Sequence, residues 1–370
     1  MFKPFIIDRQ PVLLDFFKNP KKIESYHTEQ WSLLLRTARN SVLLAQVGRV
    51  MQQHGLAHLA PKKVKDHIDS AQTIIEYRKR TALWELNRLW RALLESEIEI
   101  IILKGGAYLL IELPFSNSRM FADIDILVNK SDINKLEQTL LNKNWKSVKL
   151  EEYDQHYYRE WMHEIPPLRH ITRIIEVDIH HTILPLTSRL TPDPQKLIDH
   201  AIESTQYGFK TLSPCDMYLH SATHLFYDSD LNNRLKDLVD LDQLTRHFSE
   251  IKSDFFDQLL IRGKELDLHR PLFYALHYSQ KLLGTPVSSE ILKASKIGAP
   301  PTVIRLFMDI LVPWAILPEH PDHPQVKVAI ARWLLYVRSH YLRMPLKLLL
   351  PHLLYKAKVR LTEKEFIHTG

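Results

Sequence analysis

Two aspartates, Asp123 and Asp125, are the residues of this chain whose types and spacing point most directly to chemistry. They interrupt the apolar stretch FADIDILV, which is typical of a buried β-strand. Alternate residues of a strand point to the same face, so we expect both carboxylates on one side of a sheet. Neighbouring carboxylates on an apolar strand repel each other and are costly to bury, and a bound cation offsets both effects. Oxygen ligands favour Mg²⁺, with Mn²⁺ as the alternative ion.

A second feature of the same stretch is a turn that suits phosphate, formed by Lys104, Gly105 and Gly106. An apolar run over residues 98–103 predicts a buried strand before the turn, and residues 107–113 predict a short helix after it, ended by a proline. A helix that begins directly after glycines presents free backbone N–H groups and its positive dipole end. We therefore expect the charge of Lys104 and these amides to bind nucleotide phosphates.

A third carboxylate is predicted on a later strand, residues 171–183, which read ITRIIEVDIHHTI. Alternation places Asp178 and His180 on one face of this strand. Asp178 could complete a metal site or deprotonate an attacking hydroxyl. His180 could do either or orient a phosphate, and the alternative for His180 and His181 is a polar strand face near the surface.

Composition sets the class of protein. The 370 residues have 45% apolar and 25% charged content, as in an ordinary globular protein. A single cysteine, Cys215, excludes an internal disulfide framework and fits a reducing compartment, so we expect a cytoplasmic location. No apolar run reaches membrane-spanning length, so no integral membrane contact is expected. The formal charge of +6 favours an anionic partner such as a nucleic acid, although it also serves solubility.

Hydrophobic periodicity divides the chain into three regions. Residues 1–97 are predicted to be helical, residues 98–190 to form the catalytic core, and residues 191–370 to form a second helical domain. In the first region, Trp31, Trp84 and Trp90 fall at helical spacing and are predicted to lie in the core.

Further elements of the core follow the acid pair. Residues 131–145 predict a helix capped by Ser131. Residues 145–150 and 157–165 predict two more strands. These elements complete a small sheet with helices around it.

Two histidines of the C-terminal helical region, His220 and His224, lie four residues apart on one helix face. This spacing can bind zinc, but no third ligand is nearby and the glutamate of a zinc-hydrolase motif is absent, so a role on a polar face or against a ligand is favoured. A charged run follows on a helix, and most of its charges are predicted to form a solvated face. The run contains Arg234, Lys236, Asp237, Asp240 and Asp242.

The segment of residues 332–360 is rich in basic side chains and poor in acids. It could be an RNA-binding surface, a peripheral membrane contact, or the basic flank of a packed helical domain. Its basic residues include Arg338, Arg343, Lys347, Lys356, Lys358 and Arg360.

The order of these motifs resembles the polymerase-β-type nucleotidyltransferases, and specifically a bacterial family described only as uncharacterised nucleotidyltransferase. The resemblance covers about residues 95–250 and rests on LKGG, Arg119, DIDILV, VDIHHTI and the helical stretch LSPCDMYLHSATHLF. It implies an α+β fold with a polymerase-β-type core, a small mixed sheet with helices, flanked by helical regions. The Gly-Ser of the superfamily turn is replaced here by Lys104-Gly105.

The resemblance also implies roles for individual residues. Asp123 and Asp125 match the metal-binding pair, and Asp178 matches the third acid. The implied reaction moves a nucleoside monophosphate from an NTP such as ATP to an acceptor hydroxyl with two Mg²⁺ ions. Arg119 and His180 are the further nucleotide-binding candidates.

The acceptor is the least specified part of this prediction. The net positive charge favours RNA, with tRNA as a natural candidate given related transferase toxins of the superfamily. Transfer to a protein or small-molecule hydroxyl is the first alternative. A degenerate module that binds nucleotide or a partner without transfer is the second, and the presence of all three acids counts against it.

Overall fold

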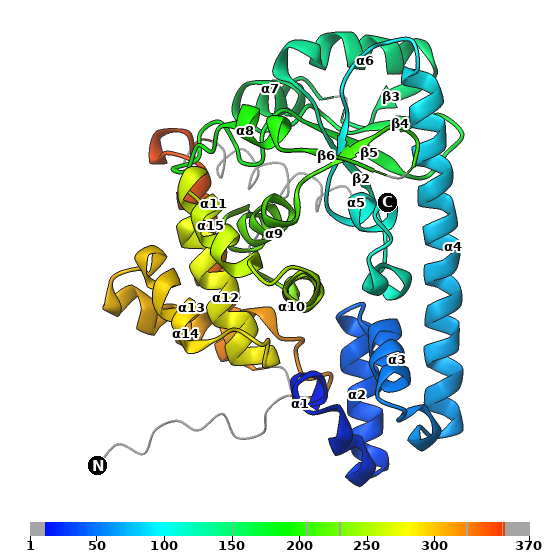
Figure 1. The fold of residues 1–370 in the computed structure, drawn as a ribbon, viewed down its shortest axis with the longest axis vertical. Coiled ribbons are helices and arrows are strands. Elements are labelled where there is room, and N and C mark those ends of the chain that lie inside the picture. Colours follow the sequence, from blue (N-terminus) through cyan, green and yellow to red (C-terminus); the bar gives the residue numbers. More distant parts are fainter. Residues whose placement is uncertain are drawn as a thin grey trace, which may run out of the picture.

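The computed structural model describes residues 12–149, 151–204, 206–228, 231–322, 325–349 and 351. Its fold is mixed α+β, with a seven-stranded sheet in the order β3-β4-β5-β2-β1-β7-β6 and helices around it (Figure 1). The strands are β1 Ile101–Ile102, β2 Ile124–Leu127, β3 Trp145–Ser147, β4 Leu168–His170, β5 Glu176–His180, β6 Ile202–Glu203 and β7 Lys210–Thr211.

The centre of the sheet is made by β2 between β1 and β5. All four residues of β2 are buried, as expected for an apolar strand covered on both faces. β2 runs parallel to β5 and antiparallel to β1. In this register Asp125 lies beside Asp178. The pairing of the two strands therefore brings together acids that are more than fifty residues apart in sequence.

The described part of the N-terminal region, which starts at residue 12, is helical. Its helices are α1 Val12–Lys18, α2 Thr28–Asn40, α3 Leu44–Gln53 and α4 Lys62–Leu93. With 32 residues, α4 is long enough to run along one whole side of the molecule, from the N-terminal helices to the sheet (Figure 1). It contacts α3 at one end and α5 and α6 near the sheet, so it holds the N-terminal helices and the core together.

The three tryptophans predicted to lie in the core differ in their burial. Trp31 is buried and Trp90 is half-buried, but the prediction for Trp84 is wrong, because 48% of its surface is exposed. The guanidinium of Arg88 lies 4.9 Å from the Trp84 ring centre and that of Arg173 lies 5.7 Å away. The exposed Trp84 ring is therefore stabilised by cation–π contacts with two arginines.

The helices of the core region are α5 Lys104–Leu110, α6 Ile133–Asn142, α7 Glu152–Trp161 and α8 Pro194–Asp199. The helix after the glycine turn begins earlier than predicted, at Lys104, and Pro114 starts a 3₁₀ turn instead of ending the helix. Ser131 does not cap α6. It lies in a 3₁₀ turn, Lys130–Asp132, that leads into α6 and is capped by Asn129, whose side chain accepts a hydrogen bond from Ser131 N.

The predicted strand over residues 157–165 is wrong, because most of it belongs to α7. Tyr153 and Tyr157, four residues apart, stack at 6.4 Å between ring centres, and Trp161 meets Tyr157 edge-on one turn later. Aromatic residues favour strands, but contacts at helical spacing outweigh that propensity here. Glu164, just beyond α7, pairs with His180 through an isolated β-bridge.

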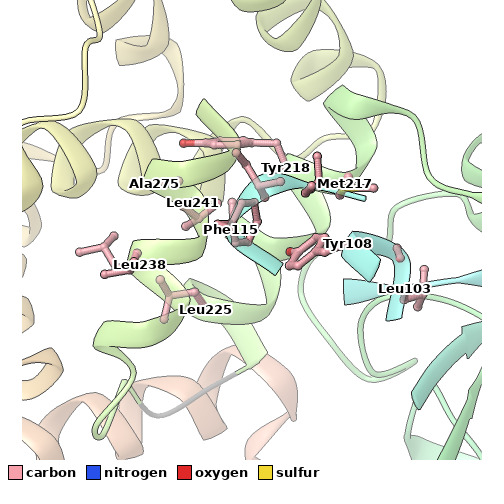
Figure 2. Close-up of a cluster of buried hydrophobic side chains, with 14 of the residues drawn as sticks. Leu103, Tyr108, Phe115, Met217, Tyr218, Leu225, Leu238, Leu241 and Ala275 are labelled. Carbon is pink, nitrogen blue, oxygen red and sulfur yellow. The ribbon is translucent and has the colours of Figure 1, made fainter. Parts of the chain in front are cut away.

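The C-terminal helices are α9 Pro214–Thr223, α10 Leu235–Ile251, α11 Phe255–Glu265, α12 His269–Leu283, α13 Ser289–Ala294, α14 Thr302–Ile316 and α15 Val326–Arg343. A π-helical segment, His224–Asp228, extends α9. Figure 2 shows how buried side chains join α9, α10 and α12 to the end of β1 and to α5. Tyr108 of α5 lies near Met217 of α9 in this cluster, and its hydroxyl lies 2.7 Å from Ser221 Oγ, so α9 is fixed beside the glycine turn.

The charged run of α10 is more buried than predicted. Asp240 and Asp242 are 5% and 6% exposed, so the solvated-face prediction is wrong for both. Asp240 pairs with Arg119 at 2.8 Å, and Asp242 pairs with Arg246 at 2.9 Å. Buried carboxylates require such partners.

The described part of the chain contains no single helix that is both long and apolar enough to cross a membrane. A bent pair, Ser289–Gly298 with Thr302–Ile316, reaches the required length and composition only when its two helices are taken together.

Candidate active site

Asp125 is the centre of a buried group of charges at the carboxyl end of β1. Its Oδ1 accepts from Lys104 Nζ at 2.8 Å, and the Asp125 side chain is only 7% exposed. Burial alone would raise the pKa of Asp125, but Lys104 and His180 hold it well below its usual range. Asp125 is therefore an anion with one oxygen already paired to a cation.

The other two predicted acids lie on either side of Asp125. Asp178 is its neighbour on β5, and its buried Oδ1 has no hydrogen-bond partner among the described residues. Burial, followed by the charges of Asp125 and Glu164, raises the pKa of Asp178 to about 8. Asp123 precedes β2 and is exposed to solvent. Partial desolvation and then the charge of Asp125 raise its pKa.

His180 links the acids to a pair of residues that the sequence analysis did not select. Its Nε2 lies 3.1 Å from Asp125 Oδ1, and its Nδ1 lies 3.4 Å from Glu164 Oε2. The ring of His163 stacks on His180 at 5.1 Å between centres. Burial lowers the pKa of His180, but Glu164 and Asp125 raise it above its usual value. The missed signal was the dipeptide His163-Glu164, hidden in a segment assigned to a strand.

His220 of α9 and His224, the first residue of the π-helical segment, interact electrostatically with Lys104 and Asp125. Burial, followed by the charge of Lys104, holds the pKa values of His220 and His224 well below their usual range. Both imidazoles are therefore neutral. Within the described residues, the group of side chains close enough to share a metal is His163, Glu164 and His180, which includes neither histidine of α9.

Arg119 and the two glycines form a packed support under Lys104. Arg119 is held by Asp240 through Nε at 2.8 Å. A Cβ on Gly105 would lie 2.5 Å from an Arg119 guanidinium nitrogen, and one on Gly106 would lie 2.7 Å from the Ile102 side chain. A larger residue at either position would therefore displace the Arg119 or the Ile102 side chain, which favours glycine at both. The structure places Arg119 against the turn, and its direct contact with a nucleotide stays a prediction.

The sequence of the chain matches the model of a protein family. The model of a family described as uncharacterised nucleotidyltransferase matches residues 27–284, which is well over half of the chain. The chain belongs to this family. The resemblance inferred from the motifs is thereby confirmed, and nucleotidyltransferase activity is the function that the family description gives. No curated protein and no solved structure matched the chain.

A pocket of about 340 Å³ in this nucleotidyltransferase family member lies away from the acids. It is at the other end of β1 and β2, and its lining includes Glu99, Val128 and Lys210. Lys104 and Asp125 do not line it. We assign the candidate site to the group around Asp125 and Asp178 and not to this cavity, because these carboxylates are desolvated and their pKa values are perturbed.

The raised pKa of Asp178 predicts a pH effect on the stability of the metal-free protein. A carboxyl whose pKa is raised on folding stabilises the folded state while protonated, so its contribution falls as pH rises from about 4 to about 8. With chelator present, the wild type should lose stability over this range relative to Asp178→Asn. Thermal unfolding of both proteins across pH measures this difference, and two parallel curves would contradict the assignment.

Proposed function

We propose that the chain transfers a nucleoside monophosphate from an NTP to an acceptor hydroxyl at Asp123, Asp125 and Asp178. Membership of a nucleotidyltransferase family supports the reaction class. The observation that carries the site assignment is the β2–β5 register, which sets Asp125 beside Asp178 with Lys104 paired to Asp125. We propose a polymerase-β-type core for the sheet and its helices, with residues 1–97, 98–190 and 191–370 as functional regions.

The three acids fit Mg²⁺. They supply only oxygen ligands, and the buried Asp178 Oδ1 lacks a partner among the described residues, as expected of an atom that awaits a cation. Asp123 and Asp125 would hold one ion, and Asp178 would share a second. When bound, the ions would neutralise the charge of the triphosphate and of the attacking oxygen.

Each side chain then has a defined task. Asp178, which lies beside Asp125 on β5, takes the proton of the acceptor hydroxyl. Lys104 pairs with Asp125 in this structure, and it would contact the phosphates when a metal is bound to Asp125. The amides of Gly105 and Gly106, in the first turn of α5, assist it. Arg119 remains a proposed nucleotide contact. His180, whose two ring nitrogens face Asp125 and Glu164, is proposed to act on the nucleotide through Asp125.

RNA is the proposed acceptor, and the positive charge of the chain supports it. The basic segment over residues 332–360 contributes less than its composition suggests. Arg332 and Arg338 donate to backbone carbonyls within the protein, at 3.1 Å and 3.0 Å respectively. Arg343 and Lys347 are also described, whereas Lys356, Lys358 and Arg360 lie outside the described residues.

Salt should weaken RNA binding steeply. Each neutralised phosphate of a single strand contributes about −0.7 to the slope of log affinity against log salt. Neutralising Lys347, Lys356, Lys358 and Arg360 together should flatten this slope and weaken RNA binding without changing NTP affinity. Fluorescence anisotropy at several salt concentrations measures the effect. An unchanged slope would remove this segment from the RNA surface.

The acceptor class is tested by fractionation. The protein is incubated with Mg²⁺, each labelled NTP, and either total RNA or total protein. Label in RNA supports the proposal, whereas label confined to protein or small molecules rejects the RNA acceptor and leaves transfer standing. Binding of NTP without released pyrophosphate would instead indicate a nucleotide-binding module.

A further inference from the structure

The group formed by His163, Glu164 and His180 has the composition of a metal site of its own. One ligand atom from each of these residues lies within 4.8 Å of the others. A metal ion with bonds of about 2.1 Å holds neighbouring ligand atoms about 3.4 Å apart in a tetrahedral site, so closing each pair by at most about 1.4 Å completes the arrangement. Movements of this size are within reach of side-chain rotation.

The backbone explains why these three residues meet. Glu164 pairs with His180 through an antiparallel bridge, and Ile165 N donates to Ile179 O at 3.0 Å. The His181 amide also donates to His163 O, at 2.9 Å. The segment after α7 is thus held along β5 by hydrogen bonds. The ligands are positioned by the sheet and not by a free loop.

Burial makes the group suitable for a tightly held ion. His163 and His180 are 5% and 3% exposed, and the Glu164 side chain is 16% exposed. Two imidazoles and one carboxylate are a ligand set of catalytic zinc sites, in which a fourth position stays open. The proposed metal site is open to solvent at Glu164, the most exposed of its three residues.

The surroundings of His180 also fit a metal ligand. Metal-bound histidines usually donate their other ring N–H to a carboxylate, which fixes the ring. Here His180 Nδ1 faces Glu164 while Nε2 faces Asp125 Oδ1 at 3.1 Å. Asp125 therefore occupies the orienting position behind a ligand on Nδ1.

We propose that His163, Glu164 and His180 bind a transition-metal dication that accepts imidazole ligands, such as Zn²⁺. The ligand chemistry separates this site from the Mg²⁺ site, because Mg²⁺ takes oxygen ligands and imidazole suits zinc and its neighbours. His180 connects the two sites through Asp125. The inference goes beyond nucleotidyl transfer, and its test needs no transfer assay.

Metal analysis tests the proposal on the full chain, purified without a polyhistidine tag. After Zn²⁺ loading, gel filtration and washing with excess Mg²⁺, about one equivalent of zinc should remain. His163→Ala and the isosteric Glu164→Gln should each bind Zn²⁺ at least about tenfold more weakly in calorimetry. Asp123→Ala should retain the metal, because it removes a ligand of the other site only.

A histidine far from the proposed metal site provides the control. His58→Ala removes an exposed histidine of the N-terminal region and should leave zinc binding unchanged. Thermal unfolding without metal verifies that each variant folds. Zinc absent from the wild type would overturn the proposal, and so would zinc retained by folded Glu164→Gln and His163→Ala. In that case a protonated His180 between Glu164 and Asp125 holds the group together.

Discussion

Asp123→Ala and Asp125→Ala are each expected to lower nucleotidyl transfer by at least about 10³-fold, to the level of the background reaction. Both acids hold the cation that neutralises the triphosphate in the proposed mechanism. Asp123 is exposed, so its removal should not disturb folding. Asp125 is buried against Lys104 and His180, so Asp125→Asn, which keeps its shape, is the companion variant. Incorporation of α-labelled NTP into the acceptor measures the loss.

A carboxylate on a neighbouring strand provides the matched control. Glu176 lies on β5 two residues before Asp178, but it is half-buried and pairs with Arg169 at 3.3 Å. Glu176→Gln should keep most of the activity. Transfer at the wild-type rate by pure Asp123→Ala and Asp125→Asn would rule out the assigned site.

The second large effect is on stability. Asp240→Ala is expected to lower the free energy of unfolding by about 3–5 kcal/mol, because it leaves the charge of Arg119 buried without its partner. Arg119 also packs between the rings of Tyr108 and Phe121, at 5.4 Å and 5.7 Å from their centres. Its side chain is only 18% exposed, so it cannot become fully hydrated without disrupting the support of the glycine turn. Urea denaturation followed by circular dichroism measures the change.

Two comparisons isolate the cause of this loss. Asp66→Ala breaks an exposed ion pair with Lys62 and should change stability by less than about 1 kcal/mol. The double variant Arg119→Met with Asp240→Leu should recover part of the lost stability, since no unpaired charge remains. Equal losses in Asp240→Ala and Asp66→Ala would mean that the buried pair carries no special weight.

Local patterns in the sequence identified the candidate acids but not the residues that surround them in the fold. Alternation within a strand indicates which residues share a face, and it selected Asp178 and His180. It cannot show which strands are neighbours. The parallel pairing of β2 with β5 arises from the packing of the whole sheet, and only that pairing sets Asp125 beside Asp178.

The missed residues have a similar explanation. The stretch before His163 is aromatic, which favours a strand on propensity, yet it forms α7. The burial of Asp240 depends on Arg119, which lies 121 residues away in sequence, so the local charge pattern of α10 could not reveal it. Buried charges are determined by distant partners, and local periodicity carries no information about them.

The position of the label in the NTP tests the central claim most directly. The protein is incubated with Mg²⁺, total RNA and an NTP labelled on either the α or the γ phosphate. Nucleotidyl transfer predicts that the α label enters the acceptor while the γ label leaves in pyrophosphate. With Asp123→Ala, neither α-label incorporation nor release of labelled pyrophosphate should occur. Entry of the γ label into the acceptor, or pyrophosphate release that persists in Asp123→Ala, would contradict the account.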